Sequence, residues 1–189
     1  MAGANEVNTM TPERAQFHLL LLEAGEGRLF HSEMNAALEA ENPLSELMLA
    51  LSLYGSDEES MHVLRAYLLD HPVDMTLVEH MLRQELRAWL EQGAMSPETC
   101  LKMMHPLACD TQDGHELTLF ADVVAVEEYR DLAADGILCE EAYVLSLEAL
   151  LKAEPLPDVW KLHREILRAK KRGEPYPGEG HPGVLALPE

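Results

Sequence analysis

Apolar residues recur every three or four positions through most of the chain, the spacing that places them on one face of an α-helix. The clearest example contains Met61, Leu64 and Leu68. Ser56 and Glu59 have the spacing of a capping box at its start, and a His-Pro pair marks its end. This segment is therefore predicted to be an amphipathic helix.

Similar cap and stop signals divide the rest of the chain into further helices. Their predicted starts are at Thr11, Ser32, Asn42, Asp74, Ser96, Asp113, Leu138 and Pro157. The His105-Pro106 pair is expected to interrupt the helix that begins near Ser96. At three joints between helices, a large apolar residue follows two positions after a glycine, which is expected to end the preceding helix in the left-handed conformation. These joints are Gly27-Arg28-Leu29, Gly93-Ala94-Met95 and Gly136-Ile137-Leu138.

One segment, Leu117 to Val126, leaves a buried strand open as an alternative, because it is nearly all apolar and contains three valines. No other segment alternates with a period of two, so a strand there would lack a partner. The sequence thus predicts an all-α fold, a single compact domain of eight or nine short amphipathic helices arranged as stacked hairpins. This domain is expected at 11–172, after a flexible N-terminus (1–10) and before a flexible, Pro- and Gly-rich tail (173–189).

Charge narrows the classes of function. The 189 residues include 34 Asp and Glu against 14 Lys and Arg, a formal net charge of −20. This charge disfavours free nucleic acid and anionic membranes as partners, because both bind proteins through Lys and Arg. A hydrophobic content of 47% indicates that the acidic chain nevertheless folds.

The sequence favours a cytoplasmic protein. Residues 1–10 lack the cationic start and apolar run of a secretory signal, and the longest leucine stretch is far shorter than a membrane span. The three cysteines lack a paired framework and are expected to be reduced.

Metal and catalytic motifs are weak. Cys100, His105, Cys109 and His115 form a C-x4-H-x3-C-x5-H series, but its spacing matches no common zinc site, and no metal or cofactor is predicted. The chain has no phosphate-binding glycine loop and no nucleophile or zinc-protease motif. We therefore expect a protein that is not an enzyme.

The position of the acids along the helices separates two groups. Asp57, Glu58 and Glu59 fall in a predicted first turn, where carboxylates complement the helix dipole. The second group lies toward a helix C-terminus, where the dipole and like-charge spacing make negative charge unfavourable. Its members, the predicted partner-binding residues, are Glu127, Glu128, Asp131 and Asp135.

The C-terminal part departs from this acidic character. Residues 152–189 hold seven basic and six acidic side chains, whereas 1–151 hold seven and 28. Lys161, Arg164, Arg168, Lys171 and Arg172 form a basic stripe, which we expect to lie along the acidic body or to complement its own helix end.

These features favour an acidic binding protein that neutralises a basic protein, such as a nuclease, a toxin or a nucleoprotein complex. Immunity proteins, antitoxins and phage-encoded inhibitors of host defence share this physical type, and a carboxylate-lined helical body suits a cationic nucleic-acid-binding cleft. A secretion chaperone or adaptor that holds an apolar client segment is the main alternative. An enzyme or metal-binding protein without a recognisable motif is the second.

Overall fold

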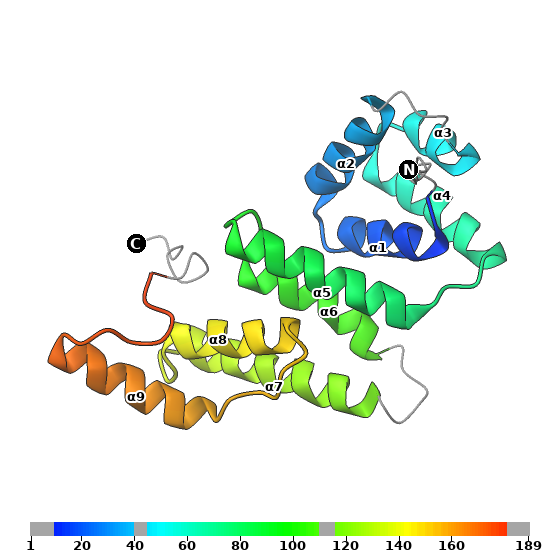
Figure 1. Ribbon diagram of the computed structural model, residues 1–189. Coiled ribbons are helices and arrows are strands. Elements are labelled where there is room, and N and C mark those ends of the chain that lie inside the picture. Colours follow the sequence, from blue (N-terminus) through cyan, green and yellow to red (C-terminus); the bar gives the residue numbers. More distant parts are fainter. Residues whose placement is uncertain (1–9, 40–44, 110–115, 181–189) are drawn as a thin grey trace, which may run out of the picture. The chain divides into compact units, whose positions relative to one another are not determined.

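The chain is described by a computed structural model over residues 10–39, 45–109 and 116–180 (Figure 1). Within these ranges it forms nine α-helices and no β-strand. The all-α prediction is confirmed, and every described helix lies within the predicted range 11–172. The helices fall into two compact units, and the boundary between them along the chain lies between Met81 and Leu82.

The first unit contains four helices and the start of a fifth. They are α1 (Pro12–Glu23), α2 (Gly27–Glu39), α3 (Glu46–Ser52), α4 (Asp57–Asp70) and α5 (Met75–Glu91). α1 packs against both α2 and α4, and α3 packs against α4. Their apolar faces enclose a core whose most deeply buried members include Ala15, Phe30, Met48, Leu51 and Leu64.

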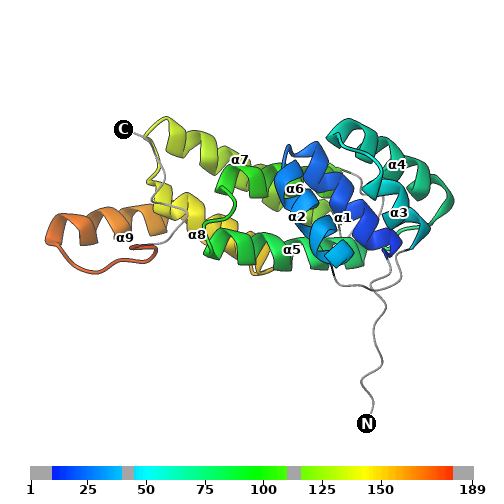
Figure 2. The same cartoon turned by 90° about the horizontal axis from the view of Figure 1, so that it is seen from above.

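The second unit contains the rest of α5 and four more helices. These are α6 (Pro97–Cys109), α7 (Glu116–Ala134), α8 (Glu140–Leu151) and α9 (Val159–Arg172). α7 packs against α6 and α8, and α8 also packs against α9 (Figure 2). From α6 to α9, consecutive helices thus pack against one another, as in the predicted hairpins.

Four predicted helix starts are confirmed by their caps. The Thr11 hydroxyl accepts the Arg14 N–H at 3.2 Å, and the Ser56 hydroxyl accepts the Glu59 N–H at 3.3 Å. The Ser96 hydroxyl accepts the Thr99 N–H at 3.1 Å, and the Asp74 carboxylate accepts the N–H groups of Thr76 and Leu77. Each cap provides a partner for amides that the first helical turn leaves unpaired.

The predicted start of the second helix at Ser32 is wrong, because α2 begins at Gly27. The Glu26 carbonyl already accepts the N–H groups of Leu29 and Phe30, so the helix needs no side-chain cap at Ser32. The left-handed residue before it is Gly25 (φ 86°), not the predicted Gly27. At Gly27 an added Cβ would lie 2.1 Å from the Asp57 carboxylate, so a side chain there would require Asp57 to move away from His31.

The third helix begins at Glu46, where the Ser45 hydroxyl caps the Met48 N–H at 3.3 Å. The predicted start at Asn42 lies outside the described residues. At the next two joints, Gly93 and Gly136 have positive φ angles of 65° and 69°, as predicted. The apolar residues two positions later, Met95 and Leu138, are both buried.

The predicted interruption of α6 at Pro106 is also wrong, because the helix continues to Cys109. Proline removes one backbone N–H, and the carbonyl four residues earlier loses its partner. That carbonyl belongs to Lys102, and both Lys102 and Pro106 are exposed. Water can therefore bind the released carbonyl, which lets the helix pass through the proline.

The strand alternative for Leu117 to Val126 is wrong, because this segment forms part of α7. Val123 and Val126 are fully buried and lie three residues apart on one side of the helix. The helix ends at Ala134, and after the left-handed Gly136 the Ile137 N–H donates to the Leu132 carbonyl. The Asp113 half of the predicted capping box lies outside the described residues.

The first part of the predicted tail, 173–180, turns back toward α8. A side chain at Gly178 would lie 3.3 Å from the Cβ of Glu141, and the Lys170 ammonium lies 5.2 Å from the centre of the Tyr176 ring. Residues 181–189 and 1–9 lie outside the described ranges. In the part of the chain that is described, no helix is both long and apolar enough to cross a bilayer.

Candidate functional site

The predicted acidic residues lie at the C-terminal end of α7, but they do not all point the same way. Glu128, Asp131 and Asp135 are exposed. Asp135 follows the last residue of α7 and continues its turn, since its N–H donates to the Asp131 carbonyl at 3.0 Å. Spacings of three and four residues place these three carboxylates on one side of the helix.

Glu127 is separated from the other three. Its carboxylate lies 2.9 Å from Nδ1 of His105 on α6 and is only partly exposed. This contact joins α6 to α7, which is a structural role that the sequence pattern did not indicate. The candidate binding surface is therefore reduced to Glu128, Asp131 and Asp135.

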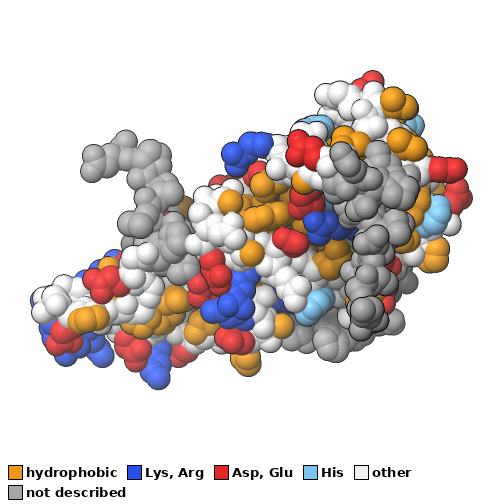
Figure 3. All heavy atoms as spheres, turned by 45° about the horizontal axis from the view of Figure 1, so that its top comes forward, with side chains coloured by type: hydrophobic (Ala, Val, Ile, Leu, Met, Phe, Trp, Pro, Cys, Tyr) orange, Lys and Arg blue, Asp and Glu red, His pale blue; other side chains and the backbone are white. Residues whose placement is uncertain are grey.

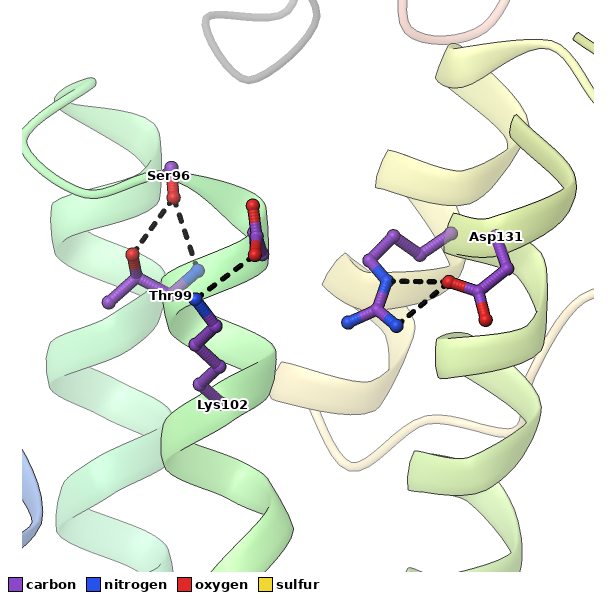
Figure 4. A network of polar contacts seen from close by, with 6 residues as sticks. Ser96, Thr99, Lys102 and Asp131 are labelled. Carbon is purple, nitrogen blue, oxygen red and sulfur yellow. Dashed lines mark hydrogen bonds and ion pairs between the residues drawn. The ribbon is translucent and has the colours of Figure 1, made fainter. Parts of the chain in front are cut away.

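Arg130 is the cation that the sequence places near this group. Its guanidinium donates to the Asp131 carboxylate at 2.8 and 3.0 Å (Figure 4). The Asp131 side chain is 68% exposed, so this pair contributes at most about 1 kcal/mol and leaves the carboxylate accessible. Within the described part of the chain, Glu128 and Asp135 form no ion pair.

The same side of α7 is apolar in its first half. Phe120 is 41% exposed and Val124 is 40% exposed. They precede Glu128 by eight and four residues, so they continue the line of its carboxylate toward the N-terminus. We call this surface the outer face of α7, and it consists of Phe120, Val124, Glu128, Asp131 and Asp135.

The pKa of Tyr129 shows the effect of the negative charges beside this face. Partial burial raises the pKa of its phenol, and the carboxylates of Glu128, Asp158 and Asp122 raise it further. Three carboxylates around one phenol disfavour a fourth negative charge there. A cation placed at this end of α7 would relieve the repulsion.

A second candidate site lies in the first unit, at a pocket of about 340 Å³ between α1, α2 and α3. The Glu33 carboxylate lies 2.8 Å from Nε2 of His18 and also accepts from the Arg14 guanidinium. The guanidinium in turn lies 4.6 Å from the centre of the Phe17 ring. The residues lining the pocket are Met10, Arg14, His18, Glu33, Met34, Ala36, Ala37 and Met48.

Glu33 is held in its charged form by these neighbours. Burial alone would raise the pKa of its carboxyl, but the hydrogen bond from His18 and the charge of Arg14 outweigh it and lower the pKa. The His18 side chain is only 4% exposed, so the contact ties α1 to α2 deep inside the unit. The methionines beside it offer a flexible apolar wall to any group that enters.

This pocket was missed in the sequence. Arg14 and His18 are four residues apart within a leucine-rich helix, so their shared side was a usable signal. Their partner on α2 could not be found, because α2 was predicted to begin only one residue before Glu33. Polar residues inside an apolar stretch are the feature of the sequence that indicates a buried polar contact.

The Cys/His series noted in the sequence forms no cluster among its described members. Cys100 is fully buried with Sγ 3.9 Å from the Leu86 carbonyl, and His105 contacts Glu127. The Cys109 side chain and His115 lie outside what the structure describes. Among the residues described, no three potential ligands are grouped closely enough to hold a metal ion.

Lys and Arg side chains lie along α9 (Figure 3). Of the predicted stripe, Arg172 pairs with Glu174 at 3.0 Å, just beyond the end of the helix. The cation that lies on the acidic body is Lys170, which is outside the predicted stripe and pairs with the buried Glu141 carboxylate on α8. The other cations, Lys161, Arg164, Arg168 and Lys171, are exposed and form no ion pair with any residue that the structure describes.

The fold and these surfaces define a small, acidic, all-α protein with charged outer helix faces. No family model, curated protein or solved structure matches the chain. Its function is therefore inferred from the charges and contacts described above.

Proposed function

We propose that this chain is a cytoplasmic, non-enzymatic binding protein that captures a basic protein on the outer face of α7. The observation that carries the proposal is the group of three exposed carboxylates, Glu128, Asp131 and Asp135, at the end of a helix whose dipole opposes them. Like charges at this spacing and position cost roughly 0.3–1 kcal/mol each. A bound cationic surface would offset that cost.

The physical type is that of immunity proteins, antitoxins and phage-encoded inhibitors. Nucleases and nucleoprotein complexes present cationic clefts, and a helical body with a net charge of −20 is attracted to them at long range. The exposed Phe120 and Val124 would add apolar contact beside the charged end. Such a partner would associate rapidly, and its association would weaken with salt.

The test compares the wild-type chain with the variant E128Q/D131N/D135N. Wild-type protein is immobilised, and basic proteins of the host that bind at about 0.15 M salt and leave at about 0.5 M are identified by mass spectrometry. Association and dissociation rates are then measured with the purified partner. The variant is expected to associate about tenfold more slowly, because steering depends on these charges.

The matched control is E46Q/E58Q/D70N, which removes three exposed carboxylates of the first unit. Asp57 is unsuitable for this purpose because its carboxylate lies 2.8 Å from Nε2 of His31. An equal loss of association rate in the control and the α7 variant would show that total charge matters and not α7. Binding that is unchanged at about 0.5 M salt would exclude electrostatic capture altogether.

The methionine-lined pocket supports a second candidate, a chaperone or adaptor for an apolar client segment. Its volume of about 340 Å³ suits one or two apolar side chains of a partner. Met34 is a buried residue of the pocket wall, so the substitution Met34→Lys would place a charge in the pocket. Client binding that is lost in this variant and insensitive to salt would favour the chaperone over electrostatic capture.

A further inference from the structure

The side of α9 that points away from α8 is both basic and apolar. Trp160 is 43% exposed and Leu167 is 46% exposed. Positions 160, 164, 167, 168 and 171 follow one another at three- and four-residue spacing, so their side chains share one side of the helix. We call this surface the outer face of α9, and it consists of Trp160, Lys161, Arg164, Leu167, Arg168 and Lys171.

The opposite side of α9 is firmly attached. Val159, Ile166 and Ala169 are buried, and Lys170 pairs with Glu141 on α8. Asp158 caps the first turn and Gly173 ends the last one in the left-handed conformation. The outer face therefore cannot turn inward, and its apolar side chains, Trp160 and Leu167, stay exposed within the part of the chain that is described.

The outer face of α7 matches this surface in order and in spacing. Val124 and Asp135 are eleven residues apart, as are Trp160 and Lys171, which is about 17 Å along each helix. With the two helices parallel, Val124 meets Trp160 and the acidic end of α7 meets the basic end of α9. The charged positions then pair as Glu128 with Arg164, Asp131 with Arg168 and Asp135 with Lys171.

We infer that two copies of this chain associate by placing the outer face of α9 of one copy on the outer face of α7 of the other. Each copy carries both faces, so two equivalent contacts form in one dimer if the arrangement is two-fold symmetric. The inference goes beyond the proposed function, because it needs no foreign partner. It also gives the exposed Trp160 an apolar partner in Val124.

A second copy fits these observations better than a polyanion. Nucleic acid and anionic lipid would both be repelled by the net charge of −20. The outer face of α7 instead presents Val124, Glu128 and Asp131 in the order in which α9 presents Trp160, Arg164 and Arg168. The long-range repulsion between two copies is screened beyond roughly 8 Å at about 0.15 M salt. The local contacts then decide the association.

The experiment measures the mass of the full chain by sedimentation velocity across a concentration series up to roughly 0.5 mM, a range chosen for a weak complex. The wild type should rise from its monomer mass of 21.1 kDa toward twice that value. The α9 variant R164E/R168E and the α7 variant E128K/D131K should each stay monomeric. All four substituted side chains are exposed, and circular dichroism checks that helix content is preserved.

Mixing the two variants gives the decisive result. Each mixed pair joins a normal α9 to a normal α7 and a reversed α9 to a reversed α7, so the dimer should return. The four-substitution chain R164E/R168E/E128K/D131K should also dimerise by itself. A wild type that stays monomeric, variants that dimerise like the wild type, or a mixture that stays monomeric would overturn the inference.

The same variants separate this inference from the proposed function. R164E/R168E keeps the outer face of α7, so it should still capture the basic partner while it fails to dimerise. Loss of partner capture in E128Q/D131N/D135N, together with a monomeric wild type, would support the proposed function and overturn the dimer. Binding of a single-stranded DNA oligonucleotide by monomers, lost in R164E/R168E, would instead assign the outer face of α9 to nucleic acid and overturn the dimer.

Discussion

Replacing Glu33 with glutamine should lower the free energy of unfolding by about 2–3 kcal/mol. The bond from the buried His18 contributes about 1.5–3 kcal/mol, as expected for a charged acceptor. The Arg14 pair adds only about 0.5–1 kcal/mol, because both side chains are more than a quarter exposed and solvent screens them. Glutamine keeps one acceptor oxygen, so part of this stabilisation remains in the variant.

The loss should depend on pH in a defined direction. The pKa of Glu33 is lowered in the folded protein, so its charge stabilises the fold fully above the ordinary carboxyl pKa. That stabilisation disappears as pH falls through the lowered pKa. The difference between wild type and Glu33→Gln should therefore be constant from about pH 7 to pH 5 and narrow below about pH 4.5.

Urea unfolding followed by circular dichroism provides the measurement at each pH. Glu46→Gln is the control, since Glu46 is an exposed carboxylate in the first turn of α3 and should cost at most about 1 kcal/mol. A Glu33→Gln protein as stable as this control at pH 7 would refute the reasoning. So would a stability difference that widens as the pH falls.

Two further predictions concern backbone and core. Gly136→Ala should lower the free energy of unfolding by about 1 kcal/mol, because the φ angle there is +69°. Gly55→Ala should have no measurable effect, because Gly55 has no positive φ and has open space around it. Chemical denaturation compares the two variants, and equal losses of stability would contradict the explanation. Leu64→Ala should lower the free energy of unfolding by about 2–5 kcal/mol, because Leu64 is fully buried. Leu53→Ala, at a side chain that is 83% exposed, should lower it by less than about 0.5 kcal/mol. Similar thermal midpoints for the two variants would contradict the described core.

Helix starts were predictable where one side chain completes the first turn. Thr11, Ser56, Asp74 and Ser96 all cap as expected, because a cap involves residues only two or three positions apart. The start of α2 was not predictable in this way, since a backbone carbonyl begins that helix. The interruption of α6 at Pro106 was wrongly predicted, because the sequence did not show that this side of the helix is exposed.

The candidate site was predictable only in part. The spacing along α7 correctly placed Glu128, Asp131 and Asp135 together on an exposed side. It could not show that Glu127 turns toward His105, 22 positions earlier in the chain, because that contact depends on how α6 packs against α7. The contact between His18 and Glu33 was hidden for the same reason.

The course of α5 limits how the chain can be divided. The boundary between the two compact units falls between Met81 and Leu82, inside a helix that runs from Met75 to Glu91. A break there would sever about four consecutive backbone hydrogen bonds of that helix. A truncated fragment of either unit would therefore have to keep the whole of α5, and a genetic exchange of one half for another would have to cross over outside it.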